Sequence, residues 1–536
     1  MLSLELGRRG VGAILFDEKD STAFSPQANA TQARTMEHYR RLGFAAEVRA
    51  LGLPEDYPTD ISYFTRFAKH ELARFKLPSA CEAQERVGSL SGSWSAAELP
   101  HRVSQKFVER VLYRHAQGLD SISLRYGWRV VSFEDRHDHV VAEAVNVQSG
   151  EHTAVRARYL VAGDGARSFV RRALGIRYEG ETGVTRDFFG GRMYALHLRA
   201  PDFYKVVPHG PAWMNVTFNQ DRRAFMCAVD GRGEFAFHTQ LRDGEDDGAI
   251  TEEGALAMFC AAVGAPIQAE ILSRGTWTAG HALVAERFQQ GRIFLGGDAA
   301  HLFTPAGGLG YNTAVEDAVN LGWKLAATIK GVGGPSLLKS YEFERRRVAM
   351  RNTGYARGFA ESLGLFKAKD GLEDESERGR ELRREAGAYL EAHGRSEFYI
   401  PGITFGARYD GSPIILSDGS SPPPDSANVY VPTATPGGRP PHAWLGESCS
   451  LYDLFGSEWT LLRLGGLPPD AQGFERTASG AGVDLKVVDI PSEEILDIYA
   501  APLVLIRPDQ IVAFRGVSDS DAASTLAVVT GSHAEG

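Results

Sequence analysis

The spacing of apolar residues divides the first part of the chain into helical and strand-like segments. A helix-like stretch over residues 2–9 precedes a short apolar run over residues 11–16, an order that predicts a helix, a glycine turn and a strand. Apolar residues recur at helical spacing over residues 107–116, whereas residues 140–147 and 154–161 alternate or run apolar as strands do. We therefore expect an α/β fold.

The pattern changes in the middle of the chain. Between residues 186 and 274, strand-like segments such as 193–198 and 224–229 are interleaved with aromatic side chains, which predicts an inserted β-rich domain. An apolar strand returns over residues 292–297, and we expect a long helix over residues 312–330.

The last third of the chain contains a connector and a small domain. Residues 369–395 are rich in charge and predict a solvated helical segment. Residues 418–441 are dense in proline, serine and glycine, so we expect an extended connector at a domain boundary. Strand-like runs at 459–464, 485–490 and 503–506 then indicate a small terminal α/β domain.

Length, charge and cysteine content exclude several classes of protein. The 536 residues predict two or three domains, and 43% hydrophobic with 24% charged residues is typical of a globular chain. A formal net charge of -10 argues against a nucleic-acid partner. The four cysteines show neither the spacing of a metal site nor that of a redox dithiol, and no apolar stretch approaches a membrane span. We expect a cytoplasmic protein without a metal ion.

Residues 291–326 carry the strongest chemical signal: an apolar strand, an acidic turn, a glycine-rich loop and an amphipathic helix, in that order. The glycines let the backbone approach a ligand closely, and the helix start offers unpaired N–H groups to electron-rich atoms, as a flavin ring would require. A generic strand–loop–helix unit is the alternative. The residues expected to bind the cofactor here are Gly297, Asp298, Pro305, Gly307, Gly308, Gly310 and Asn312.

With the motif GDGARS at residues 163–168, this segment resembles the paired Asp motifs of the single-component FAD-dependent aromatic hydroxylases, the phenol hydroxylase-like flavoprotein monooxygenases. The resemblance implies a Rossmann-like FAD-binding domain, an inserted β-rich substrate domain and a C-terminal thioredoxin-like domain. We expect the FAD-binding domain to comprise 1–185, truncated at its start and including some segments of the substrate domain, and 275–368. We expect the substrate domain at 186–274, a helical segment and connector at 369–440, and the thioredoxin-like domain at 441–536.

The resemblance also assigns residues outside the glycine-rich loop. It implies that Asp164 and Arg167 lie where flavin and nicotinamide approach each other, that Arg34 reaches the flavin pyrophosphate, and that Gln105 touches the flavin. An arginine fork matches a pyrophosphate well. Local sequence alone would make Asp164 a turn residue before a glycine and Gln105 a surface residue, and for Arg34 a solvated position at a helix start fits equally well.

The beginning of the chain departs from the family pattern. In a dinucleotide-binding unit, the G-x-G-x-x-G loop precedes a ribose-binding acid by about 20 residues, and Asp17, at the end of the strand-like run, is the candidate for that acid. Counting back from Asp17 runs off the chain. A late start codon, a fragment and a natural loss are the explanations, and we expect weaker FAD binding and an unfilled position in the sheet.

The resemblance implies that NADH or NADPH reduces FAD, that O2 forms a flavin hydroperoxide, and that one oxygen passes to a small phenolic substrate. Pro305, in the loop facing the flavin, and Tyr194 and His238, in the substrate domain, are the catalytic candidates, although the last two would more often be packed residues. The alternatives are a polyketide-tailoring hydroxylase of the same fold and a flavin-free binding or scaffold protein. The terminal domain has only Cys449, so we expect a structural or oligomeric role, compatible with a homodimer.

Overall fold

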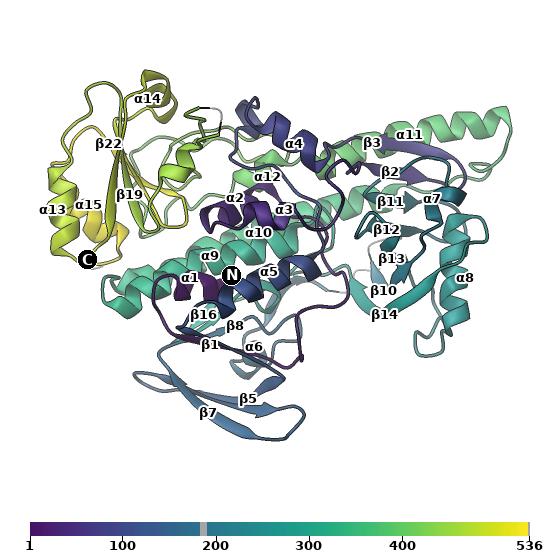
Figure 1. Ribbon diagram of the computed structural model, residues 1–536, viewed down its shortest axis with the longest axis horizontal. Coiled ribbons are helices and arrows are strands. Elements are labelled where there is room, and N and C mark those ends of the chain that lie inside the picture. The colour runs from purple at the N-terminus through teal and green to yellow at the C-terminus, as the bar shows by residue number, and fades with distance from the viewer. Residues whose placement is uncertain (183–189, 447, 534–536) are drawn as a thin grey trace.

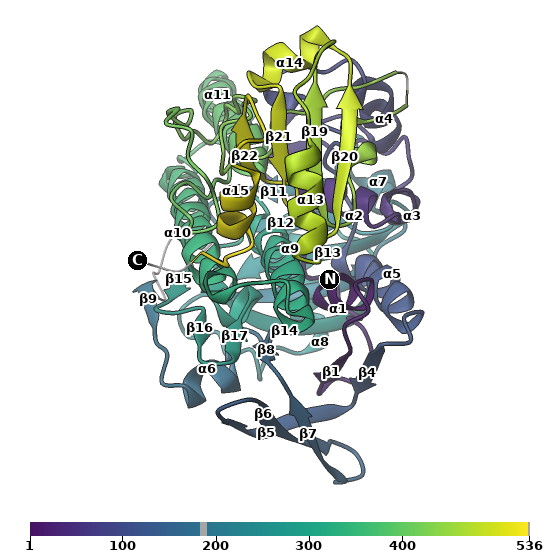
Figure 2. The ribbon, with the colours of Figure 1, turned by 90° about the vertical axis from the view of Figure 1, so that its left-hand side faces the viewer.

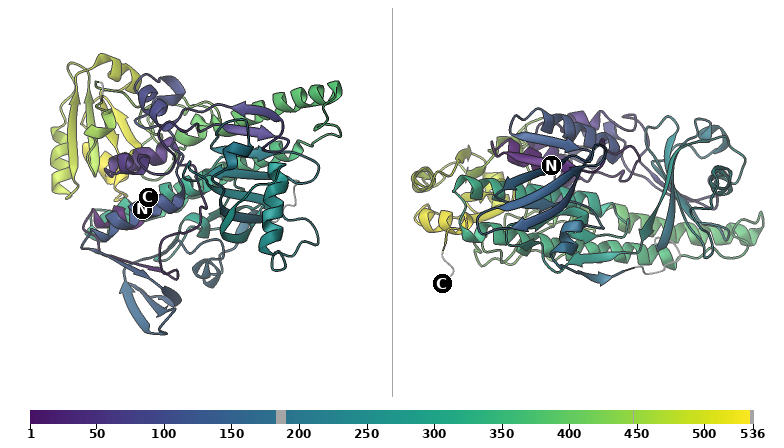
Figure 3. Two further views of the ribbon diagram at one scale, coloured as in Figure 1. Left: turned by 45° about the vertical axis from the view of Figure 1, so that its right-hand side comes forward. Right: turned by 90° about the horizontal axis from the view of Figure 1, so that it is seen from below.

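The computed structural model describes residues 1–182, 190–446 and 448–533. A seven-stranded sheet lies at one end and a small four-stranded α/β domain at the other, with long helices between them (Figures 1 and 3). In the described part of the chain, no helix is both long and apolar enough to cross a bilayer.

Two small sheets, each with one parallel strand pair, lie next to each other in the part of the chain expected to bind FAD. Strand β1 (Ala13–Asp17) follows helix α1 (Leu2–Gly7) and pairs in parallel with β4 (Ile122–Tyr126). Strand β8 (Leu160–Ala162) pairs in parallel with β17 (Ile293–Leu295), which is hydrogen-bonded to β16 (Gln289–Gln290). Five strands of the seven-stranded sheet lie between β8 and β17 in the chain, whereas its other two strands precede β8.

The run at residues 154–161, predicted as one strand, forms two. Strand β7 (His152–Ala157) belongs to an antiparallel meander with β5 (Trp128–Asp135) and β6 (Val140–Asn146), whereas β8 pairs with β17. The chain changes sheet between β7 and β8, which periodicity cannot show because both strands are apolar and extended.

The inserted sheet confirms the predicted β-rich region. Its strand order is β14-β10-β13-β12-β11-β2-β3. The strands are β2 (Ile61–Phe64), β3 (Glu71–Phe75), β10 (Gly191–Arg199), β11 (Met214–Thr217), β12 (Ala224–Ala228), β13 (Glu234–Gln240) and β14 (Glu270–Ala279). Two of them come from early in the chain, and β2 pairs in parallel with β11.

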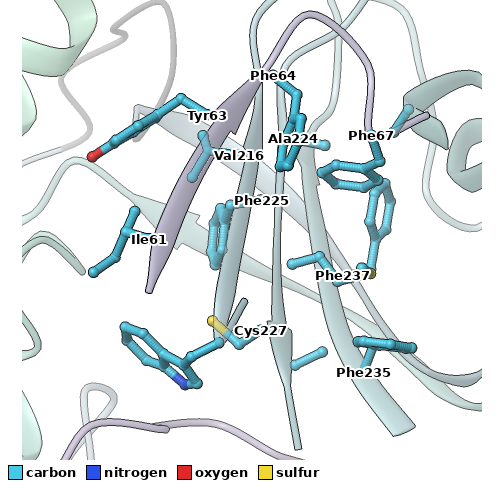
Figure 4. Close-up of a cluster of buried hydrophobic side chains, with 14 of the residues drawn as sticks. Ile61, Tyr63, Phe64, Phe67, Val216, Ala224, Phe225, Cys227, Phe235 and Phe237 are labelled. Carbon is cyan, nitrogen blue, oxygen red and sulfur yellow. The ribbon is translucent and has the colours of Figure 1, made fainter. Parts of the chain in front are cut away.

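Side-chain alternation gives this sheet two different faces. Phe235 and Phe237 pack with Phe259 of α8 (Glu252–Val263) on one face. Phe225 and Cys227 point to the other face, as Figure 4 shows. Because successive residues of a strand point to opposite faces, the register decides which side chains meet the helix and which stay available to a ligand.

Three long helices join the two ends of the molecule: α9 (Leu309–Lys330), α10 (Pro335–Leu365) and α11 (Glu377–Phe398). Helix α9 confirms the predicted helix and begins three residues earlier than expected, directly after Gly308. The shorter helices are α2 (Ala33–Arg41), α3 (Ala45–Arg49), α4 (Ala80–Val87), α5 (Gln105–Gln117), α6 (Phe169–Ala173), α7 (Phe203–Val206) and α12 (Pro401–Phe405). A further small sheet contains β9 (Tyr178–Glu181), β15 (Ala282–Ala285) and β18 (His301–Leu302).

The terminal domain has the thioredoxin-like topology that the resemblance implies. Strand β19 (Trp459–Leu464) pairs in parallel with β20 (Leu485–Ile490) and antiparallel with β21 (Leu503–Ile506), which pairs antiparallel with β22 (Val512–Gly516) (Figure 2). Helices α13 (Gln472–Gly480), α14 (Glu493–Tyr499) and α15 (Ala522–Val529) complete it. The segment predicted as a connector, residues 418–441, contains neither helix nor strand.

Candidate functional site

A cavity of about 2710 Å³ connects the end of β17, the glycine-rich loop and the open face of the seven-stranded sheet. Pockets for one small molecule usually measure about 300–1,000 Å³, so this cavity has room for more than one ligand. The residues predicted for the cofactor that line it are Asp17, Gln105, Asp164, Arg167, Gly297, Asp298, Pro305, Gly307, Gly308 and Gly310.

The glycine-rich loop has a backbone shape that side chains would disturb. Gly307 and Gly308 adopt left-handed conformations, with φ of 68° and 64°. A Cβ atom on Gly308 would lie 3.2 Å from the Cβ atom of Ala30, closer than ordinary contact. Helix α9 begins at the next residue, so its unpaired first-turn N–H groups and positive dipole end favour electron-rich ligand atoms in front of the loop.

Asn312 holds this loop in place from behind and does not line the cavity. Its amide nitrogen donates hydrogen bonds to the carbonyl oxygens of Ala30 (3.0 Å) and Gly308 (2.7 Å). Its amide oxygen accepts from the backbone N–H of Gln32 (2.9 Å) and from the Thr35 hydroxyl (2.8 Å). The side chain thereby uses both donors and two acceptor positions, so the expectation that it binds the cofactor directly is replaced by a role in positioning the loop.

Asp317 supports the turn at Gly297 in the same way. Its carboxylate accepts hydrogen bonds from the Gly297 N–H (3.1 Å), His301 Nε2 (2.7 Å) and Arg345 Nε (2.7 Å). Burial alone would raise the pKa of Asp317, but the neighbouring His301 and Arg345 lower it to about 2. The ionised carboxylate therefore anchors the turn that presents Asp298 to the cavity.

The two acidic motifs meet on one wall of the cavity. Burial raises the pKa of Asp298 against the influence of His301, and its backbone oxygen accepts a hydrogen bond from the Tyr178 hydroxyl. Asp164 Oδ2 accepts from the Val170 N–H at 3.0 Å, so this carboxylate also closes the turn before α6. The exposed Arg167 lies beside it.

Asp17 and Gln105 reach the opposite part of the cavity. Asp17 ends β1, and its Oδ1 accepts from the Lys19 N–H at 2.9 Å. Gln105 begins α5 and donates to Glu109 Oε1 at 2.6 Å. Strands β1 and β8 both contribute to the cavity wall, and no strand of the described residues joins their two sheets.

The structure does not bring Arg34 to the cavity. Its guanidinium donates to Glu37 Oε2 (2.9 Å), to Gln510 Oε1 (3.1 Å), and to the backbone oxygens of Asp509 (2.9 Å) and Gln510 (3.1 Å). The same planar fork that would suit a pyrophosphate here binds the terminal domain. We therefore correct the expectation that Arg34 binds the cofactor: in this structure it ties α2 to the segment after β21.

Of the two predicted substrate contacts, only His238 lines the cavity. Its ring stacks on Phe225 with centroids 4.5 Å apart, and its Nδ1 accepts a hydrogen bond from Trp277 Nε1 at 3.1 Å. Burial lowers the pKa of His238 to about 4, so the ring is neutral at pH 7. Because an indole N–H only donates, the neutral ring carries its proton on Nε2 and can donate it to a ligand.

The structure corrects the prediction that Tyr194 contacts the substrate. It pairs with Thr239 of β13, one residue from His238, and alternation turns it away from the cavity into the core. Its hydroxyl is buried and has no hydrogen-bond partner among the described residues. A side chain on this face cannot touch a substrate on the other.

Glu397 and Arg102 line the cavity and were not predicted as site residues. Glu397, at the end of α11, accepts from the Gly307 N–H (2.9 Å) and from His393 Nε2 (2.7 Å). Arg102 lies in the segment before α5, with its guanidinium 4.2 Å from the centroid of the Trp213 ring. The His393–Glu397 spacing of four residues was a usable signal for a buried pair, whereas nothing local distinguishes Arg102.

These residues suit the ring and ribityl half of FAD. The cradle at Gly307 and Gly308 would be filled by added Cβ atoms, and Asp298 offers acceptors for hydroxyl groups. Asn29, which lines the cavity, has a buried side-chain oxygen without a hydrogen-bond partner in the described part of the chain. A ligand with hydroxyl or N–H donors would satisfy it.

Comparison with known proteins agrees with this geometry. Residues 1–356 match the family model of the FAD binding domain, and residues 433–532 match that of the aromatic-ring hydroxylase C-terminal domain. The chain is 31% identical to the FAD-dependent monooxygenase opdD of Penicillium oxalicum, over 94% of this chain and 99% of that protein. It is 29% identical to the 2,4-dichlorophenol 6-monooxygenase of Cupriavidus pinatubonensis, over 97% and 92% of the two chains.

Among solved structures, the rebeccamycin biosynthetic enzyme RebC with reduced flavin superposes with a TM-score of 0.87. The two share 33% identity, and the match covers 99% of this chain and 96% of RebC. Fold, motifs and comparisons thus agree along nearly the whole sequence. The chain belongs to the FAD-dependent aromatic-ring hydroxylases and is a flavoprotein monooxygenase.

Proposed function

We propose that this enzyme hydroxylates a phenolic aromatic substrate with O2 and a reduced nicotinamide, NADH or NADPH. One oxygen atom enters the ring, the other leaves as water, and the nicotinamide is oxidised. The observation that supports this most is the single cavity, which connects the glycine-rich loop with the aromatic face of the seven-stranded sheet. A ring on that face would lie in the same cavity as the cofactor.

The cofactor contacts are part of the proposal. The loop at Gly307 and Gly308 and the turn at Gly297 and Asp298 would hold the ring and ribityl chain, with Pro305 beside them. Bound FAD supplies the redox chemistry and the oxygen transfer. The side chains around it keep the loop in one shape and line the space for the substrate.

His238 would contact the substrate hydroxyl. Its Nε2 proton can be donated to a phenolic oxygen, which stabilises negative charge there and so favours the electron-rich form of the ring. The stacked Phe225 and the Trp277 hydrogen bond restrict the ring of His238 to one orientation. Since the pKa is about 4, this residue serves as a donor rather than as the general base at neutral pH.

A larger, polycyclic phenol is the second candidate substrate. The volume of about 2710 Å³ favours it, because a cofactor and one small phenol would not fill this cavity. A polyketide-tailoring hydroxylase would act on such a polycyclic phenol. Relatives named as FAD-dependent monooxygenases support an enzyme rather than a flavin-free binding or scaffold protein.

Two panels of compounds test the proposal: simple phenols and polycyclic phenols, each incubated with the FAD-loaded enzyme, O2 and NADH or NADPH. We expect nicotinamide oxidation to rise with at least one compound and a product heavier by one oxygen atom in mass spectrometry. Product from the polycyclic panel alone would select the second candidate. The absence of a hydroxylated product from both panels would contradict the proposed function.

The remaining expectations stay proposals. The domain limits at 185, 274, 368 and 440 are among them, and β2 and β3 of the seven-stranded sheet would be the substrate-domain segments expected within residues 1–185. The four cysteines are free, which suits a reducing cytoplasm. A homodimer is testable by the mass of the enzyme in solution.

A further inference from the structure

Arg102 lies at the end of the cavity formed by the seven-stranded sheet. The residue before it, His101, forms an antiparallel bridge with Thr31 through two backbone hydrogen bonds of 2.8 and 2.9 Å. Three residues later, the Gln105 N–H donates to the Ala28 oxygen at 2.7 Å. The backbone around Arg102 is thus held on both sides, so its side chain projects from a fixed position.

The guanidinium of Arg102 faces an apolar wall. It lies over the Trp213 ring, whose outer edge contacts Phe398 with centroids 6.3 Å apart. The Cys227 thiol lies near it, and burial raises the pKa of that thiol to about 12, so it carries no charge at pH 7. The surroundings therefore provide no negative charge to the guanidinium.

Arg102 lacks the polar partners that the fully buried arginines have. It forms neither an ion pair nor a hydrogen bond through its side chain with any residue that the structure describes. The fully buried arginines all have carboxylate partners: Arg345 pairs with Asp317, Arg439 with Glu37, and Arg507 with Glu344. A partly buried cation without an anion is unfavourable unless a ligand supplies one.

The charge of Arg102 persists at neutral pH. Burial lowers its pKa only to about 10, so the guanidinium remains protonated at pH 7. A second donor beside it also has no partner within the described ranges: Trp213 Nε1 is buried and forms no hydrogen bond. The cavity end thus combines a full positive charge, a spare donor and aromatic walls.

We propose that Arg102 binds a carboxylate of the substrate, so that the preferred substrates of this enzyme are hydroxyaryl carboxylic acids. The inference rests on the proposed function and names its substrate class. The planar fork of arginine matches the two oxygens of a carboxylate, while the aromatic body would lie on Met214 and Phe225 of the same sheet face.

The position of His238 agrees with such a substrate. Cys227, near Arg102, and Phe225, stacked on His238, are two residues apart on β12. Two residues of a strand span about 7 Å, which is comparable with the separation of a carboxylate and a hydroxyl group across an aromatic ring. One molecule could therefore place its carboxylate at Arg102 and its hydroxyl at His238.

Binding of a matched pair of probes tests the inference without turnover. The FAD-loaded full chain is titrated with 6-hydroxy-2-naphthoate, whose hydroxyl and carboxylate lie at opposite ends of the ring system, and with its neutral carboxamide, with no reduced nicotinamide present, by isothermal titration calorimetry. We expect the wild type to bind the acid about 10- to 100-fold more tightly than the amide. Arg102→Met should abolish this preference and leave the affinity for the amide nearly unchanged, and Arg102→Lys should retain part of it.

Arg110→Gln is the matched control, because Arg110 is an exposed arginine of the following helix that does not line the cavity. It should keep the full preference for the acid. Equal binding of acid and amide by the wild type would overturn the inference. So would an Arg102→Met variant that keeps the preference but binds FAD more weakly, since that result would assign Arg102 to the cofactor.

The experiments distinguish failure of the carboxylate site at Arg102 from failure of the proposed hydroxylation. An acid preference that depends on Arg102, without any hydroxylated product, would contradict the proposed function alone. Hydroxylation of neutral phenols with no acid preference would contradict the carboxylate site alone. Thermal unfolding midpoints of the Arg102 variants, compared with that of Arg110→Gln, show whether each variant is folded.

Discussion

The carboxylate of Glu397, at the end of α11, accepts the backbone N–H of Gly307 at 2.9 Å, joining two segments that lie 90 residues apart in the chain. Its other oxygen accepts from His393 Nε2 at 2.7 Å, within the same helix. Helix α11 thus fixes the glycine-rich loop at Gly307. The shape of this loop depends on side chains outside its own motif.

Replacing Glu397 by Gln should weaken FAD binding. Glutamine has one carbonyl oxygen instead of two, so it cannot accept from both Gly307 and His393 without turning an N–H toward one donor. We expect the dissociation constant of FAD, measured by flavin fluorescence, to rise about 3- to 10-fold. Glu391→Gln on the exposed face of the same helix is the control and should bind FAD as the wild type does.

Asn312→Ala should disturb the loop more strongly. The substitution removes four hydrogen bonds and leaves Ala30, Gly308 and Gln32 with buried groups to satisfy. We expect the free energy of unfolding to fall by about 2–4 kcal/mol, and FAD affinity to fall with it. Asn312→Asp keeps the two acceptors but loses the two donors, so an Asp variant indistinguishable from wild type would contradict this account.

Replacing Arg34 should change the stability of the protein and leave FAD binding unchanged. Because its guanidinium binds Glu37 and the backbone of Asp509 and Gln510, Arg34→Ala should lower the free energy of unfolding by about 3 kcal/mol. The affinity of the folded protein for FAD should not change. Weaker FAD binding with an unchanged unfolding midpoint would instead support the pyrophosphate contact that the family resemblance implies.

His238 should make stability depend on pH. Its pKa is about 4 in the folded protein and about 6.5 when unfolded, so the unfolded chain binds the additional proton between these values. The stabilisation is present above pH 6.5 and lost as the pH falls toward 4. Between pH 7 and pH 5, the free energy of unfolding should decrease by about 2 kcal/mol more in the wild type than in His238→Gln.

Urea unfolding of the two proteins at pH 7 and pH 5 measures this difference. Gln can still accept the Trp277 hydrogen bond through its side-chain oxygen, so the comparison isolates the titration of the ring. An equal loss of stability in both proteins would show that His238 does not titrate between these values.

Much of the fold could be predicted because strong patterns are local. The loop and helix from Gly307 onward combine glycine, a helix start and apolar periodicity within a short segment, and the structure places them as expected. The aromatic strands around Phe225 likewise form the predicted β-rich sheet. The topology of the terminal domain followed from the family resemblance and agrees with the observed strand order.

The predictions that the structure corrects depend on partners that are distant in the sequence. Arg34 binds groups 475 and 476 residues away, and no local pattern distinguishes that from a phosphate contact. Tyr194 lies on the core face of the sheet rather than on the cavity face, because the register of β10 against β13 decides the direction of its side chain. Residues 369–395 predicted a solvated helical segment because charges outnumber apolar residues there, but one face of α11 is buried.

The origin of the oxygen atom in the product tests the central claim most directly. The FAD-loaded enzyme is supplied with reduced nicotinamide, a hydroxyaryl substrate and ¹⁸O2 in ordinary water, and the product is analysed by mass spectrometry. The account predicts one ¹⁸O atom in each molecule of hydroxylated product. A hydroxylated product without ¹⁸O would contradict a monooxygenase reaction in this cavity.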